Sequence, residues 1–221
     1  MERKVVLTKD GSSSIFLPEW NEHYHSMHGA IQEAYHVFIR NGLDLFKGYR
    51  KINILEIGFG TGLNAFITFL EGKQWGIAVD YVGIEAFPVN PEEVRSLNFV
   101  EQLGVRSMNP IFLSMHESPW MSKYELDENF FLTKKKAYFQ DLIDEEAYDL
   151  IYFDAFGARV QPELWTEGIF KKMYEALVSG GVLVTYAAKG SVRRAMMAVG
   201  FQVEKLPGPP GKREMLRAKK I

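Results

Sequence analysis

The chain has 221 residues, which fits one α/β domain with additions and leaves no room for two full catalytic domains. Its composition, 47% hydrophobic and 24% charged, is that of a globular protein, and the absence of cysteine excludes disulfides and thiolate metal sites. No apolar run is long enough for a signal peptide or for the ~20 residues of a membrane-spanning helix, so the sequence predicts a cytoplasmic protein without membrane contact.

Charge is unevenly distributed along the chain, although the formal net charge is only −2. Residues 189–221 hold nine basic and two acidic residues, giving +7, and residues 1–188 therefore carry −9. A basic end on an acidic body is typical of a protein that binds a polyanion, whereas a solvated tail would explain Lys219 and Lys220 equally well.

Residues 1–50 are predicted to form a mostly helical extension that packs on the catalytic domain, which spans residues 51–221. Within the extension, apolar residues at helical spacing run from Ala30 to Leu45. The stretch from Ile52 to Ile57 is apolar and rich in β-branched residues, which indicates a buried parallel strand, and a helical pattern follows over residues 61–69.

Three glycines at alternate positions, Gly58, Gly60 and Gly62, connect this strand to this helix. Such a turn brings the backbone close to a ligand, and a tight turn by itself seldom needs three glycines. A dinucleotide-binding turn would have its third glycine at the position of Leu63, which disfavours a nicotinamide dehydrogenase. The closer spacing and the carboxylate of Glu56 suit S-adenosylmethionine better, because the methionine ammonium of that ligand can use a carboxylate.

The remaining elements alternate between strands and helices along the chain. Strands are predicted at residues 81–85, 137–141, 148–153 and 182–186, helices at 91–103, 162–177 and 189–199, an inserted hairpin region near 111–136, and a closing hairpin at 201–206 and 214–218. This order predicts a Rossmann-like α/β fold whose seven-stranded sheet is mostly parallel and has an antiparallel edge strand.

Acidic residues follow four of the predicted strands: Glu56, Glu85, Asp141 and Asp154. The carboxyl ends of parallel strands lie at one edge of the sheet, where open α/β sheets bind their ligands. We expect Glu56 to contact the methionine amino group, Glu85 the ribose and Asp141 the adenine amino group, whereas Asp154 faces the methyl donor. Acidic residues also cap helices that follow strands. Capping alone would have to explain all four of these residues, which makes ligand binding the better explanation.

The segment from Asp154 to Thr166, Asp-Ala-Phe-Gly-Ala-Arg-Val-Gln-Pro-Glu-Leu-Trp-Thr, resembles a signature of the methyltransferase domain of bacterial tRNA 5-methylaminomethyl-2-thiouridine methyltransferases. The stretch from Leu55 to Asn64 is similar to the cofactor loop of this family. Residues 186–194 and 211–216 are similar to its two C-terminal blocks, and the resemblance extends from residue 26 to residue 216.

This resemblance implies a class I S-adenosylmethionine-dependent methyltransferase that acts on the anticodon region of tRNA. The reaction it implies converts 5-aminomethyl-(2-thio)uridine at the wobble position into 5-methylaminomethyl-(2-thio)uridine. Asn64 is implied as a further cofactor-binding residue, and Asp154 as the catalytic residue that orients the amine or accepts its proton. The family domain is often fused to a flavin-dependent oxidase, and we expect a stand-alone module without FAD because the sequence ends at Ile221.

A wobble base has to leave its stack to enter such a site, where aromatic side chains can hold it. The aromatic candidates are Tyr24, Phe156, Trp165 and Tyr186, and packing in the core is the alternative for each. The candidates for contacts with the tRNA backbone are Lys189, Arg193, Arg194, Lys212 and Arg213.

Two other functions are compatible with parts of the sequence. A methyltransferase of a small amine or a protein needs the glycine turn but has no use for the basic C-terminal segments. A non-catalytic Rossmann-like RNA-binding module has no use for the strand-end carboxylates. His23, His25 and His28 suggest a metal site, but their spacing matches no zinc motif, and we expect no metal.

Overall fold

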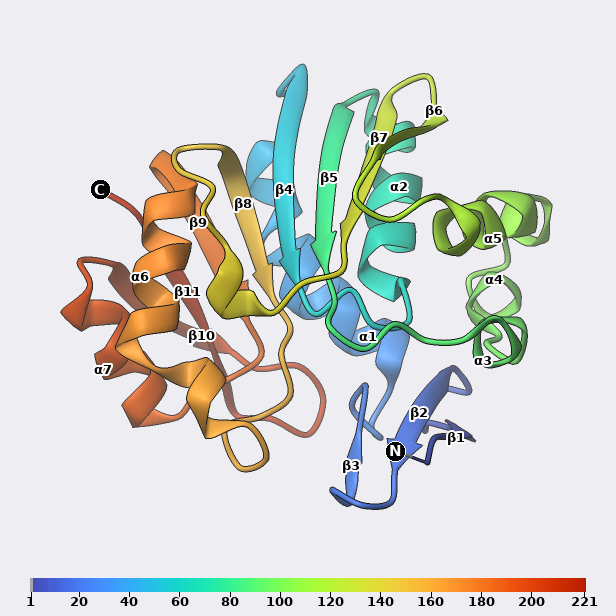
Figure 1. The fold of residues 1–221 in the computed structure, drawn as a ribbon, viewed down its shortest axis with the longest axis horizontal. Helices are drawn as coiled ribbons and strands as arrows, with labels where there is room; N and C mark the ends of the chain where they lie inside the picture. Colours follow the sequence, from blue (N-terminus) through green and yellow to red (C-terminus); the bar gives the residue numbers. More distant parts are fainter. Residues whose placement is uncertain (1) are drawn as a thin grey trace.

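Figure 1 shows the computed structural model of the protein, which describes residues 2–221. Its centre is an eight-stranded sheet with the strand order β10-β11-β9-β8-β4-β5-β7-β6. The strands are β4 (Lys51–Ile57), β5 (Ala78–Ile84), β6 (Lys123–Asp127), β7 (Phe130–Lys135), β8 (Tyr148–Phe153), β9 (Leu177–Thr185), β10 (Gln202–Pro207) and β11 (Glu214–Lys219).

Most of this sheet is parallel, as the sequence predicts. The neighbouring pairs β9/β8, β8/β4, β4/β5 and β5/β7 are parallel. At one edge β11 pairs antiparallel with β9, and β10 and β11 form the predicted closing hairpin. The Rossmann-like α/β class is confirmed, and the carboxyl ends of five neighbouring strands meet at one edge of the sheet.

The number of strands differs from the prediction of seven. Residues 123–135 form a hairpin whose second strand, β7, lies beside β5 as a parallel member of the main sheet. Alternate residues of β7, namely Phe130, Leu132 and Lys134, are buried, so one face of this strand packs in the core.

The predicted strand at residues 137–141 is wrong. Phe139–Asp141 forms a 3₁₀ turn, in which the backbone amide of Asp141 donates to the carbonyl of Tyr138 at 3.0 Å. The place beside β5 is already filled by β7, so this short segment has no free strand edge to pair with.

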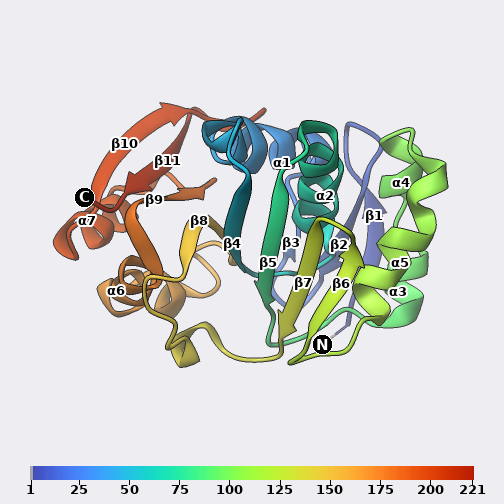
Figure 2. The same cartoon turned by 90° about the horizontal axis from the view of Figure 1, so that it is seen from above.

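Helices cover both faces of the sheet (Figure 2). Ile52 and Ile54 of β4 pack in a core cluster with α2 (Leu63–Trp75), α1 (Ala30–Ala34) and α5 (Asn109–Glu117). Leu55 and Ile57 pack in a second cluster with α6 (Glu167–Ala176) and α7 (Gly190–Ala198). Burial on both faces explains why residues that point to opposite sides of this strand, such as Ile54 and Leu55, are both apolar.

Residues 4–23 correct the expectation of a mostly helical extension. They form a three-stranded antiparallel sheet of β1 (Lys4–Leu7), β2 (Ser13–Leu17) and β3 (Glu22–His23). β2 is buried although it begins with two serines, because the amide and hydroxyl of Ser13 both donate to the side chain of Asn98 at 2.8 Å. Such long-range polar contacts leave no periodic apolar pattern in the sequence.

Two predicted helices are interrupted. Residues 30–46 comprise α1, a π-helical segment (Tyr35–Arg40) and a 3₁₀ turn (Leu43–Phe46). Residues 91–102 comprise α3 (Pro91–Arg95) and α4 (Phe99–Gln102), which are separated at the residue, Asn98, that binds β2. Arg106–Met108 and Pro162–Trp165 are further 3₁₀ turns. Within residues 2–221, no helix is both long and apolar enough to cross a membrane.

Candidate active site

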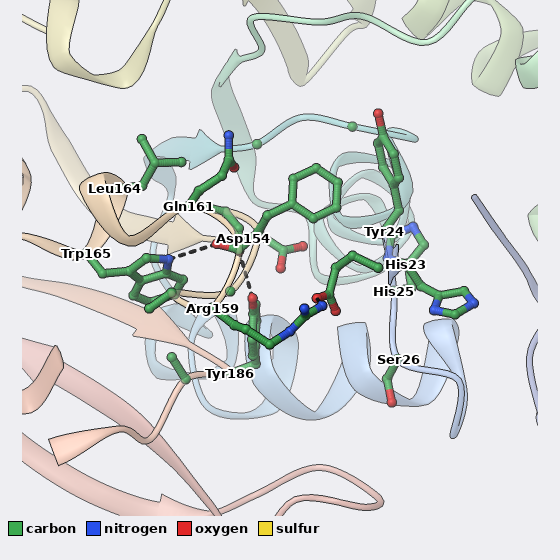
Figure 3. Close-up of a pocket in the computed structure, with 18 of the residues that line it drawn as sticks. His23, Tyr24, His25, Ser26, Asp154, Arg159, Gln161, Leu164, Trp165 and Tyr186 are labelled. Carbon is green, nitrogen blue, oxygen red and sulfur yellow. Dashed lines mark hydrogen bonds and ion pairs between the residues drawn. The ribbon is translucent and has the colours of Figure 1, made fainter. Parts of the chain in front are cut away.

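A cavity of about 1270 Å³ opens at the carboxyl ends of the parallel strands (Figure 3). Its wall is made by the glycine turn, the loop after β5, the segment after β8, the segment after β9, the β10–β11 connection and the N-terminal sheet. Small-molecule pockets ordinarily measure ~300–1,000 Å³, so this cavity has room for a cofactor together with part of a second substrate.

The glycine turn is required by the backbone that surrounds it. Gly58 has a φ of +91°, and a Cβ added to it would lie 2.6 Å from the carbonyl oxygen of Asp154. Gly62 has a φ of +71°, and its Cβ would lie 2.9 Å from Nε2 of His116. The turn therefore packs against the segment after β8 on one side and against α5 on the other.

Glu85 lines the cavity and is held by two backbone amides. Gly60 donates to one of its carboxylate oxygens at 3.0 Å, and Phe87 donates to the other at 2.8 Å. Each oxygen keeps a second lone pair, so the carboxylate can still accept hydroxyl groups of a ligand.

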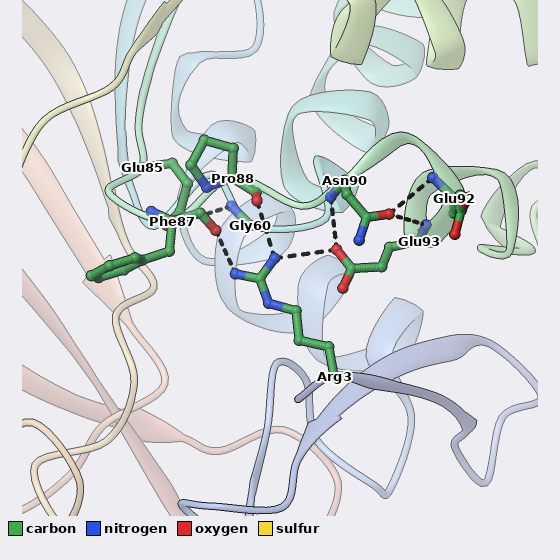
Figure 4. A network of polar contacts seen from close by, with 8 residues as sticks. All are labelled: Arg3, Gly60, Glu85, Phe87, Pro88, Asn90, Glu92 and Glu93. Carbon is green, nitrogen blue, oxygen red and sulfur yellow. Dashed lines mark hydrogen bonds and ion pairs between the residues drawn. The ribbon is translucent and has the colours of Figure 1, made fainter. Parts of the chain in front are cut away.

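Arg3 clamps the loop that carries Glu85 (Figure 4). Its guanidinium donates to the carbonyls of Phe87 at 2.6 Å and Pro88 at 3.0 Å, and it pairs with Glu93 at 3.2 Å. Arg3 also lines the cavity. The sequence does not single out Arg3, because one arginine near the N-terminus belongs to no motif.

Asp154 and Glu56 are joined by one amide group. Nδ2 of Asn64 donates to Oε1 of Glu56 at 2.9 Å and to Oδ2 of Asp154 at 2.8 Å. The hydroxyl of Tyr81 donates to the second oxygen of Glu56 at 2.9 Å. Glu56 is only 1% exposed and lies beneath the cavity, behind Asn64, and burial raises its pKa well above the usual range.

Asn64, and not Glu56, is on the cavity wall, and the contact of Glu56 with the methionine amino group stays a prediction. The strand-end position correctly places Glu56 below the site but does not tell whether its side chain is covered.

The pKa of Asp154 is raised to about 7, first by burial of the side chain and second by the nearby carboxylate of Glu33. The hydrogen bond from Asn64 and the ammonium of Lys212 act in the opposite direction. Asp154 lines the cavity, so its carboxylate is partly withdrawn from water and yet accessible to a ligand. Such a group binds a cation strongly and exchanges a proton near neutral pH.

Two aromatic side chains fix the backbone next to Asp154. The hydroxyl of Tyr186 donates to the carbonyl of Ala155, and the indole of Trp165 donates to the carbonyl of Phe156, both at 2.8 Å (Figure 3). Both side chains also line the cavity. They therefore position the segment that carries Asp154 as well as forming the wall.

Phe156 and Tyr24 are in contact with each other in the cavity wall. Their rings meet edge to face with centroids 5.1 Å apart, and Trp20 makes a similar contact with Phe156 at 5.5 Å. All three line the cavity, so the N-terminal sheet provides an aromatic side to it.

The basic residues are only partly where the sequence predicts them. Lys189 and Arg213 are exposed and line the cavity rim. Arg193 and Arg194 lie on α7 but are not part of the wall. Lys212 points inward and forms an ion pair with Glu33, which differs from the expected contact with a tRNA backbone.

Asp141 and Gly62 also lie off the cavity wall. Asp141 is exposed, because the segment that carries it turns as a 3₁₀ helix, and Gln140 lines the cavity in its place. The contact of Asp141 with adenine stays a prediction.

Glu33 is a site residue that the sequence pattern could have indicated. It lies on α1 between Ala30 and Val37, both of which are buried, so a charged residue stands on the apolar face of the helix. A carboxylate in such a position needs a partner, which Lys212 supplies from 179 residues away.

His25, from the N-terminal segment, and His116, from α5, both contact Thr61 of the glycine turn. Nε2 of His25 lies 2.7 Å from the hydroxyl of Thr61, and Nε2 of His116 lies 3.1 Å from the carbonyl of Thr61. Burial lowers the pKa of both imidazoles to about 4. Among residues 2–221, no group of three His, Asp or Glu side chains is arranged to hold a metal ion.

Comparison with known proteins gives consistent matches. A family profile described as S-adenosyl-L-methionine-dependent methyltransferase matches residues 122–221. The tRNA 5-methylaminomethyl-2-thiouridine biosynthesis bifunctional protein MnmC of Ralstonia nicotianae is 31% identical over 95% of this chain, and that of Leptospira interrogans is 29% identical over 90%. The chain spans about a third of the length of these relatives, 33% and 32% respectively.

Solved structures agree with these matches. The crystal structure of MNMC2 from Aquifex aeolicus has a TM-score of 0.77 at 26% identity and covers 99% of this chain and 70% of its own. Spermidine synthase from Thermotoga maritima, at 12% identity and a TM-score of 0.54, covers 97% of this chain and 70% of its own and shares the fold alone.

Proposed function

Because the chain belongs to a family of S-adenosyl-L-methionine-dependent methyltransferases, we propose that its cavity binds S-adenosylmethionine and methylates a primary amine on tRNA. The proposed substrate is 5-aminomethyl-(2-thio)uridine at the wobble position, and the product is 5-methylaminomethyl-(2-thio)uridine. The observation that carries this proposal is the carboxylate of Asp154, which is fixed by Asn64 on the wall of the cavity beside the glycine turn.

The donor set of the cavity fits S-adenosylmethionine. Gly58 and Gly60 present backbone without a side chain, and Glu85 offers free acceptor capacity for ribose hydroxyls. Asn64 and Asp154 both line the cavity, and the carboxylate of Asp154 gives this part of the wall a negative charge that suits a positively charged ligand. When bound, S-adenosylmethionine supplies the methyl group from its sulfonium centre.

The side chains around Asp154 suit an amine nucleophile. An alkyl amine has a pKa of order 10, so it arrives as an ammonium ion and is inert until it loses a proton. The ionised carboxylate of Asp154 binds and orients this ammonium, and its pKa of about 7 lets it hold the proton when the amine is released for attack. Asn64 keeps the carboxylate in one orientation throughout.

Replacing Glu85 with alanine is expected to weaken the affinity for S-adenosylhomocysteine by about 1.5–3 kcal/mol, roughly 10- to 150-fold, because charged hydrogen bonds to the ribose are lost. Isothermal titration calorimetry measures this change. Glu92→Ala is the matched control, because Glu92 is an exposed acid in the nearby helix α3. Equal affinities in the two variants would mean that Glu85 only holds the turn.

The exposed basic rim supports tRNA as the substrate. Lys189 and Arg213 come from separate segments and stand on the same rim. Contacts between such side chains and phosphates give an affinity that falls with salt concentration and that tolerates changes of base.

We expect the double variant Lys189→Ala/Arg213→Ala to bind tRNA more weakly and to show a salt dependence that is flatter by about one to two units of log–log slope. Fluorescence anisotropy at several salt concentrations measures the slope. Arg50→Ala/Lys51→Ala is the control, because it also removes two positive charges from exposed positions. These positions lie at the start of β4, at the end of the strand that is remote from the cavity. If both double variants behave alike, the rim does not contact RNA.

The direct test of the proposed function is mass spectrometry of tRNA nucleosides after incubation of aminomethylated tRNA with the protein and S-adenosylmethionine. The proposal requires a gain of one methyl group on the wobble nucleoside. Methylation of free amines or of protein, with the tRNA nucleoside unchanged, would favour the small-amine or protein methyltransferase instead.

A further inference from the structure

The ammonium group of one of the protein's own side chains, Lys212, lines the cavity. Nζ of Lys212 forms an ion pair with the carboxylate of Glu33 and lies 3.9 Å from the ring centroid of Tyr186. The three residues come from the β10–β11 connection, from α1 and from the segment after β9, and all three line the cavity. A carboxylate and an aromatic face are the two groups that hold an alkylammonium ion best.

The carboxylate of Glu33 is fixed and needs a cation. Its side chain is only 12% exposed, and its second oxygen accepts the backbone amide of Ser26 at 3.0 Å. A carboxylate buried to this degree is costly without a positive partner.

The backbone that carries Lys212 is also fixed. The amide of Lys212 donates to the carbonyl of Pro209 at 2.9 Å. The preceding residue, Gly211, has a φ of +83° and approaches His28 so closely that a Cβ would lie 2.2 Å from its ring. The lysine stem is thus held at its base, while its side chain is 33% exposed and has a path to the rim.

This ion pair acts on the catalytic carboxylate. The charge of Glu33 raises the pKa of Asp154, and the charge of Lys212 lowers it, so both lie within electrostatic reach of Asp154. This part of the cavity therefore holds the carboxylates of Glu33 and Asp154 together with the primary ammonium of Lys212. The substrate of the proposed reaction brings the same chemical group, a primary ammonium on an alkyl carbon.

We propose that the ammonium of Lys212 holds the place where the substrate ammonium first binds, before Asp154 orients it for reaction, and that the substrate displaces Lys212 onto the rim. Glu33 and the face of Tyr186 are then substrate-binding groups, and Lys212 is a residue that determines specificity. This inference rests on the proposed function and adds a step of recognition to it.

Displacement links entry of the amine to binding of a polyanion. The exchange of one ammonium for another keeps Glu33 paired, but the displaced lysine loses its partner unless a new anion meets it. The phosphates of an RNA bound at the rim by Lys189 and Arg213 supply that anion. A free amine brings no anion to pair with the displaced Lys212, so the displacement selects against small cellular amines.

The test uses two probes that carry the amine without a phosphate: the nucleoside 5-aminomethyluridine, and n-butylammonium, which copies the lysine side chain. Affinity is measured by calorimetry at pH 8 in the presence of S-adenosylhomocysteine. Lys212→Met is expected to bind both probes about tenfold or more tightly than the unchanged protein, because the competing ammonium is gone. Adding Glu33→Gln to this variant is expected to abolish the gain.

Lys205→Met is the matched control, because Lys205 also pairs with a carboxylate, Glu214, but lies outside the cavity wall. If Lys212→Met does not fold, Lys212→Gln keeps a hydrogen-bond donor for Glu33 and provides the same comparison. Probe affinities that are equal to or weaker than those of the unchanged protein would overturn the inference. A gain for n-butylammonium alone supports the cation site and counts against the proposed nucleoside, which the tRNA assay tests separately.

Discussion

Replacing Asp154 with asparagine is expected to lower the rate of methyl transfer to tRNA by about 10²- to 10⁴-fold. Asparagine keeps the size of the side chain and an oxygen that accepts from Asn64, but it neither attracts an ammonium ion nor holds its proton. Affinity for S-adenosylhomocysteine should stay near that of the unchanged protein. Single-turnover kinetics with labelled S-adenosylmethionine measure the rate.

Asp127→Asn is the control for this change, because Asp127 pairs with Lys73 at the opposite end of the sheet from the cavity. A rate in Asp154→Asn within about threefold of the control variant would contradict the catalytic role, since general acid–base groups contribute far more than that.

The pH dependence provides a second measure of the same carboxylate. Because the pKa of Asp154 is about 7, it is mostly neutral below that pH and cannot pair with an ammonium ion. We expect kcat/KM to rise with pH through about 7 and to fall again as the substrate amine loses its charge at a pH of order 10. A profile that is flat between pH 6 and pH 8 would place the titrating group elsewhere.

The raised pKa also has a cost for the fold. In the unfolded chain the carboxyl of Asp154 titrates near its ordinary value of 3.8, so its ionisation is harder in the folded protein. The free energy of unfolding therefore falls as pH rises from about 4 to about 7. Asp154→Asn should remove this loss and raise the stability at pH 8 more than at pH 5. The ionised carboxylate that the proposed function needs therefore lowers the stability of the fold.

The parallel part of the sheet was predictable from the sequence because burial on both faces favours consecutive apolar residues, as in the last four residues of β8. β7 was not, since Lys134 occupies one of its buried positions and interrupts the apolar pattern. This lysine donates to the carbonyl of His116 at the end of α5, a contact that only the folded chain reveals. The N-terminal sheet was missed for a similar reason, because distant polar groups satisfy its buried serines: Asn98 bonds to Ser13, and the amide of His25 bonds to Ser14.

The candidate site was predictable where position alone decides. Residues at the carboxyl end of a parallel strand reach the same edge of the sheet, which places Glu85 and Asp154 on the wall. The direction in which a side chain points, and the residue with which it pairs, were not predictable. The inward turn of Lys212 depends on Glu33, and the separation of 179 residues between them carries no local signal.

Replacing Gly58 with alanine is expected to reduce both stability and catalysis. Its φ of +91° is unfavourable for alanine, and the added Cβ would lie 2.6 Å from the carbonyl oxygen of Asp154. Strain and overpacking together should lower the free energy of unfolding by about 2–5 kcal/mol, as measured by urea denaturation. The backbone of Asp154 has to move to relieve the contact, and a misplacement of ~1 Å costs about 10²-fold in rate.

Gly76→Ala separates these two causes. Gly76 has a similar left-handed backbone, with a φ of +69°, but a Cβ added to it would meet no atom within 4 Å. This variant should lose only the conformational part, about 1 kcal/mol, and should keep its full rate of methyl transfer. A Gly58→Ala variant that retains the rate of Gly76→Ala, despite its greater loss of stability, would show that the glycine turn does not hold Asp154 in its reactive position.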